Sequence, residues 1–151
     1  MNYMKVRSKG SFFIAMLLIL SFFTSFAILE GNAVENISVN AKGFENTIII
    51  EFKNGEQNTA KIKTVNIWLA SDDSFKSFKT ESGWNGKIYG SGQGLTFSTS
   101  DLLNPGESVK FGAITDKKID AINWKLIDEN ENEIGPAKTE IVEISQTSVI
   151  I

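Results

Sequence analysis

The distribution of apolar and polar residues divides the chain into two parts. An uncharged apolar run extends from Phe12 to Leu29, directly after the cations Lys5, Arg7 and Lys9. Beyond this run, apolar residues occur in short, partly alternating stretches separated by residues typical of turns. A basic segment followed by an apolar run indicates an export signal or an N-terminal membrane anchor. Short alternating stretches indicate β-strands.

The apolar run allows two outcomes. Roughly 18 residues in a helix span about 27 Å, close to the thickness of a bilayer core, which favours a retained hydrophobic helix. Gly31 and Ala33 instead offer small residues for signal-peptide cleavage before Val34. The positive charge keeps the N-terminus inside in either case. We therefore expect residues 1–33 to be a signal peptide or anchor, and residues 34–151 to work at the cell surface or outside the cell.

Residues 34–151 predict an all-β domain. Turn signals such as Asn54-Gly55 and Asn104-Pro105-Gly106 separate the strand candidates. These candidates are residues 37–39, 47–52, 60–69, 86–89, 95–98, 108–114, 119–127 and 139–144. Strands at intervals of about 8–12 residues are typical of an antiparallel sandwich. We predict a single immunoglobulin-like β-sandwich of seven to nine strands, preceded by the N-terminal hydrophobic helix.

Bulky aromatic residues are the candidates for the core. Trp68 and Trp124 each lie in a strand candidate, and each could bury about 150–250 Å². We expect both to anchor the core. Phe75 and Phe78 are spaced like one turn of a helix, and we expect them to plug an edge of the sandwich.

Composition excludes several classes of function. The leader holds three of the 15 cations and one of the 18 anions, so residues 34–151 keep 12 cations against 17 anions. Arg7 is the only arginine. An acidic domain without arginine is a poor candidate for nucleic-acid binding, which needs a basic face. Without cysteine, the domain has neither disulfides nor a lipid anchor on a thiol, and burial alone must stabilise it.

The residue types of this chain do not favour a catalytic role. The chain has no histidine and no cysteine, so the usual general base and the thiol nucleophile are missing. Asp72 and Asp73 form the only adjacent pair of aspartates, but neighbouring side chains of an extended segment point in opposite directions. A loop cap or a solvated turn is the expected role of this pair. We predict no enzyme and no cofactor.

One acidic segment partly matches a calcium loop. Asp128, Asn130 and Asn132 have the spacing with which an EF-hand loop begins. Glu133 replaces the required glycine, however, and Thr139 stands where a bidentate glutamate is needed. We expect a polar hairpin loop without a metal; calcium held by several loops is the alternative.

Candidate ligand contacts lie around a tryptophan between glycines. Trp84 and Tyr89 could stack on sugar rings if exposed, and Asn85 could bind hydroxyl groups. In the alternative, Trp84 folds back and caps the sandwich against Phe75 and Phe78. A separate candidate is Asn36, which begins an Asn-Ile-Ser glycosylation sequon.

The segments VNIWLASDDSFKSFKTESGW (residues 65–84) and LNPGESVKFGAITDKKIDAINWKLIDENENEIG (residues 103–135) carry a family resemblance. Their ordered motifs resemble secreted or surface proteins of ammonia-oxidising archaea (thaumarchaea), a largely uncharacterised group. The resemblance implies an immunoglobulin-like module of the cell envelope or extracellular space, and no specific activity. Such proteins often carry a C-terminal sorting tail; the ending Val149-Ile150-Ile151 instead favours release or N-terminal anchoring. A fainter resemblance, through SGWNG and PGESVKFG, is to cellulose-binding sandwich modules.

Together these observations predict a non-catalytic extracellular or cell-envelope module for adhesion, envelope structure or protein–protein contact. The alternative is a carbohydrate-binding module with an exposed aromatic loop. The expected partner is an extracellular protein or a glycan, with a membrane tether through Phe12–Leu29 as a further option.

Overall fold

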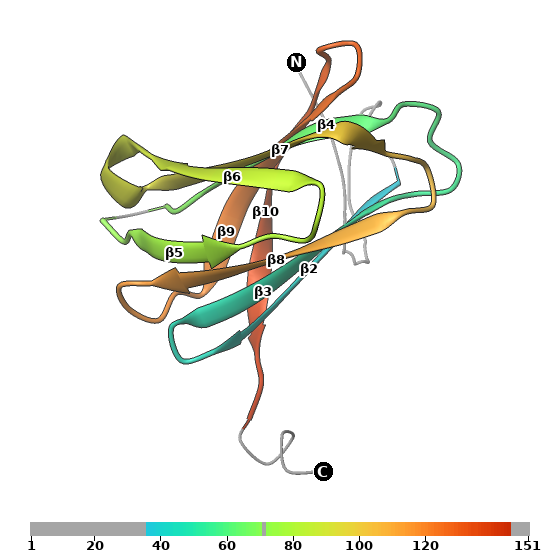
Figure 1. Cartoon of the computed structure of the whole chain (residues 1–151). Helices are drawn as coiled ribbons and strands as arrows, with labels where there is room; N and C mark the ends of the chain where they lie inside the picture. Colours follow the sequence, from blue (N-terminus) through green and yellow to red (C-terminus); the bar gives the residue numbers. More distant parts are fainter. Residues whose placement is uncertain (1–35, 71, 146–151) are drawn as a thin grey trace.

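The computed structural model describes residues 36–70 and 72–145. Within these ranges the chain forms strands and one short 3-10 helix, η1 (Figure 1). The elements are β2 (Ile37–Phe44), β3 (Thr47–Asn54), β4 (Ile62–Trp68), β5 (Phe75–Lys79), β6 (Trp84–Tyr89), η1 (Gly90–Gly92), β7 (Gly94–Leu103), β8 (Ser108–Thr115), β9 (Ala121–Asp128) and β10 (Glu133–Glu143).

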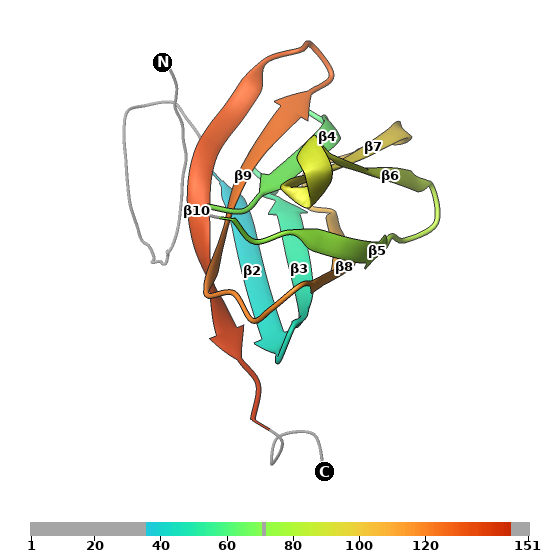
Figure 2. The same ribbon diagram turned by 90° about the vertical axis from the view of Figure 1, so that its left-hand side faces the viewer.

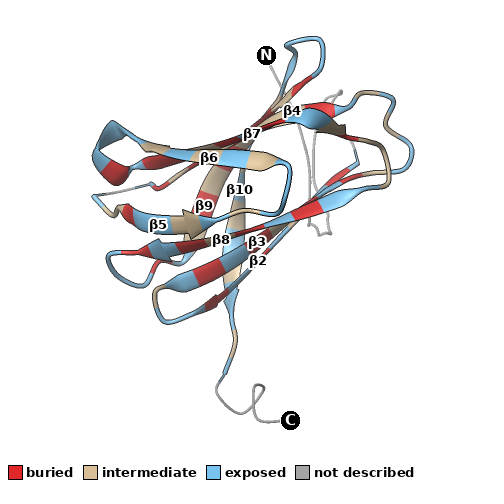
Figure 3. Ribbon diagram, in the orientation of Figure 1, coloured by how far each residue is buried: buried red, intermediate tan, exposed pale blue. Residues whose placement is uncertain are grey.

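The strands follow the order β5-β8-β3-β2-β10-β9-β4-β7-β6 and fold into two facing layers. One layer holds β5, β8, β3 and β2; the other holds β9, β4, β7 and β6. Alternate residues of each strand point into the space between the layers, so buried and exposed positions alternate along the ribbons (Figure 3). The predicted all-β, immunoglobulin-like architecture is confirmed, with nine strands in the described residues.

Strand β10 joins the two layers along one side of the molecule (Figure 2). Its first part pairs antiparallel with β9, and its last part pairs parallel with β2 through Ile141 and Ala41. The register with β9 shifts between Ile134 and Ala137, where Gly135 has φ 96°. A bulge bends a strand and increases its twist. This irregularity lies within the pairing with β9, which continues to Glu140 before Ile141 pairs with β2.

On the opposite side, β5 and β6 approach each other without ladder pairing. A hydroxyl-to-carbonyl hydrogen bond of 3.0 Å links Thr80 to Trp84 across the connecting turn. The Phe78 ring covers Gly86, where an added Cβ would come within 2.4 Å of Cε1. The sandwich therefore resembles a flattened barrel with one seam that lacks backbone hydrogen bonds.

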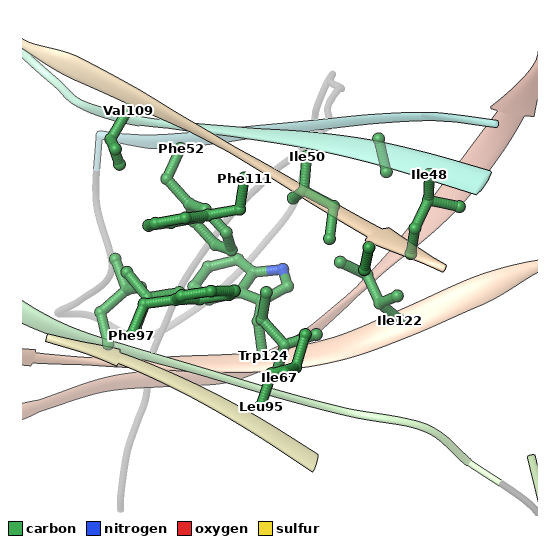
Figure 4. Close-up of a cluster of buried hydrophobic side chains, with 14 of the residues drawn as sticks. Ile48, Ile50, Phe52, Ile67, Leu95, Phe97, Val109, Phe111, Ile122 and Trp124 are labelled. Carbon is green, nitrogen blue, oxygen red and sulfur yellow. The ribbon is translucent and has the colours of Figure 1, made fainter. Parts of the chain in front are cut away.

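Aromatic side chains from both layers meet in the core (Figure 4). Phe97 of β7 and Phe111 of β8 stack with their centroids 3.9 Å apart and their planes inclined by 5°. Phe52 of β3 meets Trp124 of β9 edge to face, with the centroids 5.7 Å apart. The indole N–H of Trp124 donates a 2.9 Å hydrogen bond to the Thr139 hydroxyl on β10. These contacts connect both layers with each other and with β10.

Several strands expected from the sequence are longer in the structure, and one was missed. Phe75 and Phe78 lie on β5, an edge strand, instead of on a helical turn; Phe75 is buried, as expected of an edge plug. Trp124 is a core anchor, as predicted, with 1% of its surface exposed. The same prediction for Trp68 is wrong. Its neighbours Ile67 and Leu69 enter the core, so Trp68 points to the outer face and is half-buried.

No helix long and apolar enough to cross a membrane occurs in residues 36–70 and 72–145. The predicted signal peptide or anchor in residues 1–33 lies outside the described residues. The described strands all fall within the predicted domain of residues 34–151.

Neighbouring isoleucines test the strand register. Ile50 is fully buried, whereas Ile49 on the same strand is 49% exposed. Ile50→Ala leaves a cavity and should lower the free energy of unfolding by about 2–5 kcal/mol. Ile49→Ala should lower it by less than about 1 kcal/mol, because it creates no cavity. Urea denaturation of both variants checks this, and similar losses would contradict the assigned faces.

Candidate binding surfaces

The two outer faces of the sandwich differ in character. The outer face of β6, β7, β4 and β9 is mostly polar and carries two aromatic residues. The outer face of β2, β3 and β8, together with the end of β10, carries apolar side chains among lysines. Both compositions follow from alternation, because every second residue of each strand is directed away from the core.

On the polar face, a glycine lies between two aromatic residues in one row of cross-strand partners. Gly94 of β7 pairs with Tyr89 of β6 on one side and with Trp68 of β4 on the other. Trp68 in turn pairs with Asn123 of β9. Directly opposed residues share a face of the sheet, so Tyr89 and Trp68 lie on the same outer surface.

The Tyr89 ring lies flat on Gly94. A Cβ added to Gly94 would lie 2.3 Å from the ring atom Cζ and 2.6 Å from both of its bonded neighbours, Cε1 and Oη. An edge-on ring would bring one of those neighbours closer than Cζ, so these nearly equal distances indicate a ring that lies face-down. Tyr89 is 41% exposed, so it remains in contact with solvent in this position.

A shallow depression of about 350 Å³ lies beside this ring, and its lining is Asn85, Gly86, Lys87, Tyr89, Thr96 and Ser98. Cross-strand pairing places Lys87 next to Thr96 and Asn85 next to Ser98. The Thr96 hydroxyl donates a 2.8 Å hydrogen bond to Oδ1 of Asn66 on β4. The depression thus presents hydroxyl, amide and ammonium groups, and no carboxylate lines it.

The structure separates the three candidate contacts predicted around the tryptophan. Asn85 and Tyr89 line the outer depression, whereas Trp84 begins β6 on its inner side. Trp84 is half-buried, and its ring meets Phe111 edge to face with centroids 5.3 Å apart. An exposed loop tryptophan is therefore not found. Trp68, which sequence reasoning assigned to the core, shares the face of Tyr89 instead.

The second outer face collects most of the large exposed apolar residues. Five such residues stand out among the described ones, and four lie here: Phe44 (40% exposed), Ile49 (49%), Ile114 (41%) and Val142 (66%). Phe44, Thr47 and Ile114 form one row of partners across β2, β3 and β8. Val142, Lys42 and Ile49 form the adjacent row. The four apolar side chains are therefore neighbours in space.

Lysines lie beside these apolar residues, in the row of Ile49 and in the next two rows along the strands. Lys42 adjoins Ile49, and Lys79 of β5 follows beyond Gly112 in the same row. Lys53 and Lys110 lie farther along the same face, beside Glu51. None of the four lysines forms a salt bridge with a described residue. We call this surface the lysine-rimmed apolar face.

The acidic loop after β9 is organised by its own hydrogen bonds. The buried carboxylate of Asp128 accepts N–H donors from Asn130 at 2.8 Å and from Asn132 at 2.9 Å. The expected polar hairpin turn is therefore present. No cluster of three or more metal-ligating acidic side chains occurs in the described part of the chain.

The adjacent aspartates belong to a second structural loop. Asp73 forms a 3.2 Å salt bridge with Lys117, which raises the pKa of the lysine. The backbone N–H of Ser74 donates to Asp116 and lowers the pKa of that carboxyl. Asp72 is exposed. Asp73 and Asp116 therefore tie the segment before β5 to the loop after β8.

The glycosylation candidate Asn36 is exposed and immediately precedes β2. Its carbonyl accepts hydrogen bonds from the Gly55 N–H at 2.8 Å and from the Asn58 side chain at 3.2 Å. Its modification stays a prediction.

Comparison with solved structures places the chain in a fold class. An uncharacterized protein from Nocardia farcinica with an immunoglobulin-like fold matches 73% of this chain and 99% of its own at a TM-score of 0.51 and 12% identity. This likeness shows an immunoglobulin-like fold. A non-cellulosomal cohesin from Archaeoglobus fulgidus matches 76% of this chain and 95% of its own, at a TM-score of 0.44 and 9% identity. That likeness is too distant to carry an argument. No protein-family model and no curated protein sequence matches the chain.

A double-mutant cycle tests the position of Tyr89. Gly94→Ala should lower the free energy of unfolding by about 1–3 kcal/mol, because the new methyl group displaces the ring. In a Tyr89→Ala background, the same substitution should cost at least 1 kcal/mol less, within the range of coupling energies for contacting residues. Urea denaturation of the four proteins gives the coupling. Equal costs in both backgrounds would contradict the face-down ring.

Proposed function

We propose that this chain is an exported, non-catalytic contact module that binds an acidic protein surface through its lysine-rimmed apolar face. The observation that carries the proposal is the clustering of Phe44, Ile49, Ile114 and Val142 on one outer face. Contiguous exposed apolar patches with polar rims are typical of interaction sites, whereas scattered apolar residues need no explanation. The patch has the layout of such a site.

Charge selects the kind of partner. The whole chain has a net charge of −3, yet four lysines accompany Glu51 on the outer side of β2, β3, β5 and β8. On β10, the exposed Glu140 lies two residues before Val142. A symmetric contact between two copies would bring these lysines toward one another, and like charges in apposition are unfavourable. A partner with apolar side chains flanked by carboxylates matches both the centre and the rim.

Export is supported by the sequence alone. The basic segment followed by the apolar run Phe12–Leu29 is the pattern of a leader or an anchor. The lack of histidine and cysteine supports a binding role over a catalytic one. Together with the resemblance to archaeal surface proteins, these features favour an adhesion or envelope role.

Site-specific photo-cross-linking in the producing cells tests the proposed contact. A photoreactive residue at Ile49 or Val142 should attach to one extracellular protein, at a peptide rich in acidic and apolar residues. The control position Lys138 lies four residues before Val142 on β10, where the strand pairs with Asn123 of β9 instead of with β2, and it should give no such product. Products with lipid, with a second copy, or with the chain itself would each refute the acidic-protein partner.

Two substitutions then separate the apolar and the electrostatic contributions. Ile49→Ser and Lys42→Glu should each weaken binding of the identified partner by tenfold or more, equivalent to about 1.4 kcal/mol. Both positions are exposed, so the free energy of unfolding should change by less than about 1 kcal/mol. Lys138→Glu is the control for a charge reversal elsewhere. Calorimetric titration measures the affinities, and unchanged binding by both variants would refute the assigned face.

A further inference from the structure

We propose that the depression beside Tyr89 is a second binding site, specific for an oligosaccharide that carries carboxylate groups. It lies on the outer face of the other layer, so it is independent of the lysine-rimmed apolar face. The site combines a flat aromatic surface, a row of hydrogen-bonding groups and an ammonium group that has no salt bridge among the described residues.

The aromatic surface is already in a binding geometry. Because one face of the Tyr89 ring covers Gly94, the other face is directed away from that glycine. The flat C–H faces of a pyranose ring suit stacking on such an aromatic surface, which orders few new side-chain rotamers on binding. The missing side chain at Gly94 is what allows the ring to lie this low.

The polar groups lie at the right spacing for more than one sugar unit. Asn85, Lys87 and Tyr89 alternate along β6 on its outer side, so successive members are about 6.6–6.8 Å apart along the strand. Thr96 and Ser98 stand opposite Lys87 and Asn85 on β7. One sugar unit on Tyr89 would leave the next within reach of these amide and hydroxyl groups.

Lys87 favours a negatively charged ligand. It is exposed in the middle of the site and forms no salt bridge with a described residue. Lys125 of β9, three strands away on the same face, is already paired with Glu133 at 3.0 Å. With no carboxylate in the lining, the ammonium group of Lys87 favours a sugar that supplies one. A uronic acid is the simplest sugar of this kind.

Titration of the full-length protein with two matched probes tests the proposal. Trigalacturonic acid should bind, and the corresponding neutral galactose trimer should bind at least tenfold more weakly at low salt. Equal affinity for the two probes, or no binding of trigalacturonic acid, would overturn the proposed specificity.

Variants separate the contributions of stacking and charge. Tyr89→Ala should abolish measurable binding. Tyr89→Phe keeps the flat ring, so its affinity should stay within about threefold of the unchanged protein, because a single hydrogen bond contributes little net free energy. Lys87→Gln should bring the affinity for trigalacturonic acid down to that of the neutral trimer. Lys138→Gln, with its charge outside the depression, is the matched control and should bind like the unchanged protein.

The Tyr89→Phe and Lys87→Gln variants keep the test decisive if Tyr89→Ala is unstable. Full binding by Lys87→Gln, or equal losses in Lys87→Gln and Lys138→Gln, would overturn the site. Because Ile49→Ser alters only the other layer, its affinity for trigalacturonic acid should equal that of the unchanged protein. The failure of one surface is thereby distinguishable from the failure of the other.

Discussion

The packing of aromatic rings between the two layers is the interaction on which the rest of the structure depends. The chain has no disulfide to hold the layers together, so burial must supply the stability. Phe97 stacked on Phe111, and Phe52 against Trp124, join strands from opposite layers. The Trp124–Thr139 hydrogen bond extends this cluster to β10, the strand that pairs with both layers. Such rings bury large apolar areas at a small cost in side-chain entropy.

This arrangement leaves the outer faces available for binding. The loops, by contrast, are largely occupied with their own structure: Asp128 caps a turn, and Asp73 pairs with Lys117. Each outer face rests on strands whose inner residues are fixed in the core, so its side chains are presented on a rigid scaffold. Rigid presentation lowers the entropy lost on binding. The two surfaces also differ in chemistry, one being apolar with lysines and the other polar with a flat aromatic ring.

Two glycines shape the sandwich because they lack a side chain. At Gly94 the absent Cβ lets Tyr89 lie flat on the sheet, and at Gly86 it lets Phe78 close the seam between β5 and β6. One glycine thus shapes the outer surface, while the other completes the packing at the open edge. Neither role can be read from a list of turn-forming residues, because both glycines lie within strands.

The sequence by itself determined the all-β class, most strands and the inward position of Trp124, because strict alternation specifies one buried face. Alternation did not determine the faces where apolar residues are consecutive, as in Ile67-Trp68-Leu69 and Ile48-Ile49-Ile50, and for this reason the prediction of Trp68 as a core anchor was wrong. There only the tertiary register decided that Trp68 and Ile49 point outward. The partnership of Tyr89, Gly94 and Trp68 also depends on pairing between β6, β7 and β4. Pairing between strands joins residues that are distant in sequence, and no local pattern encodes it.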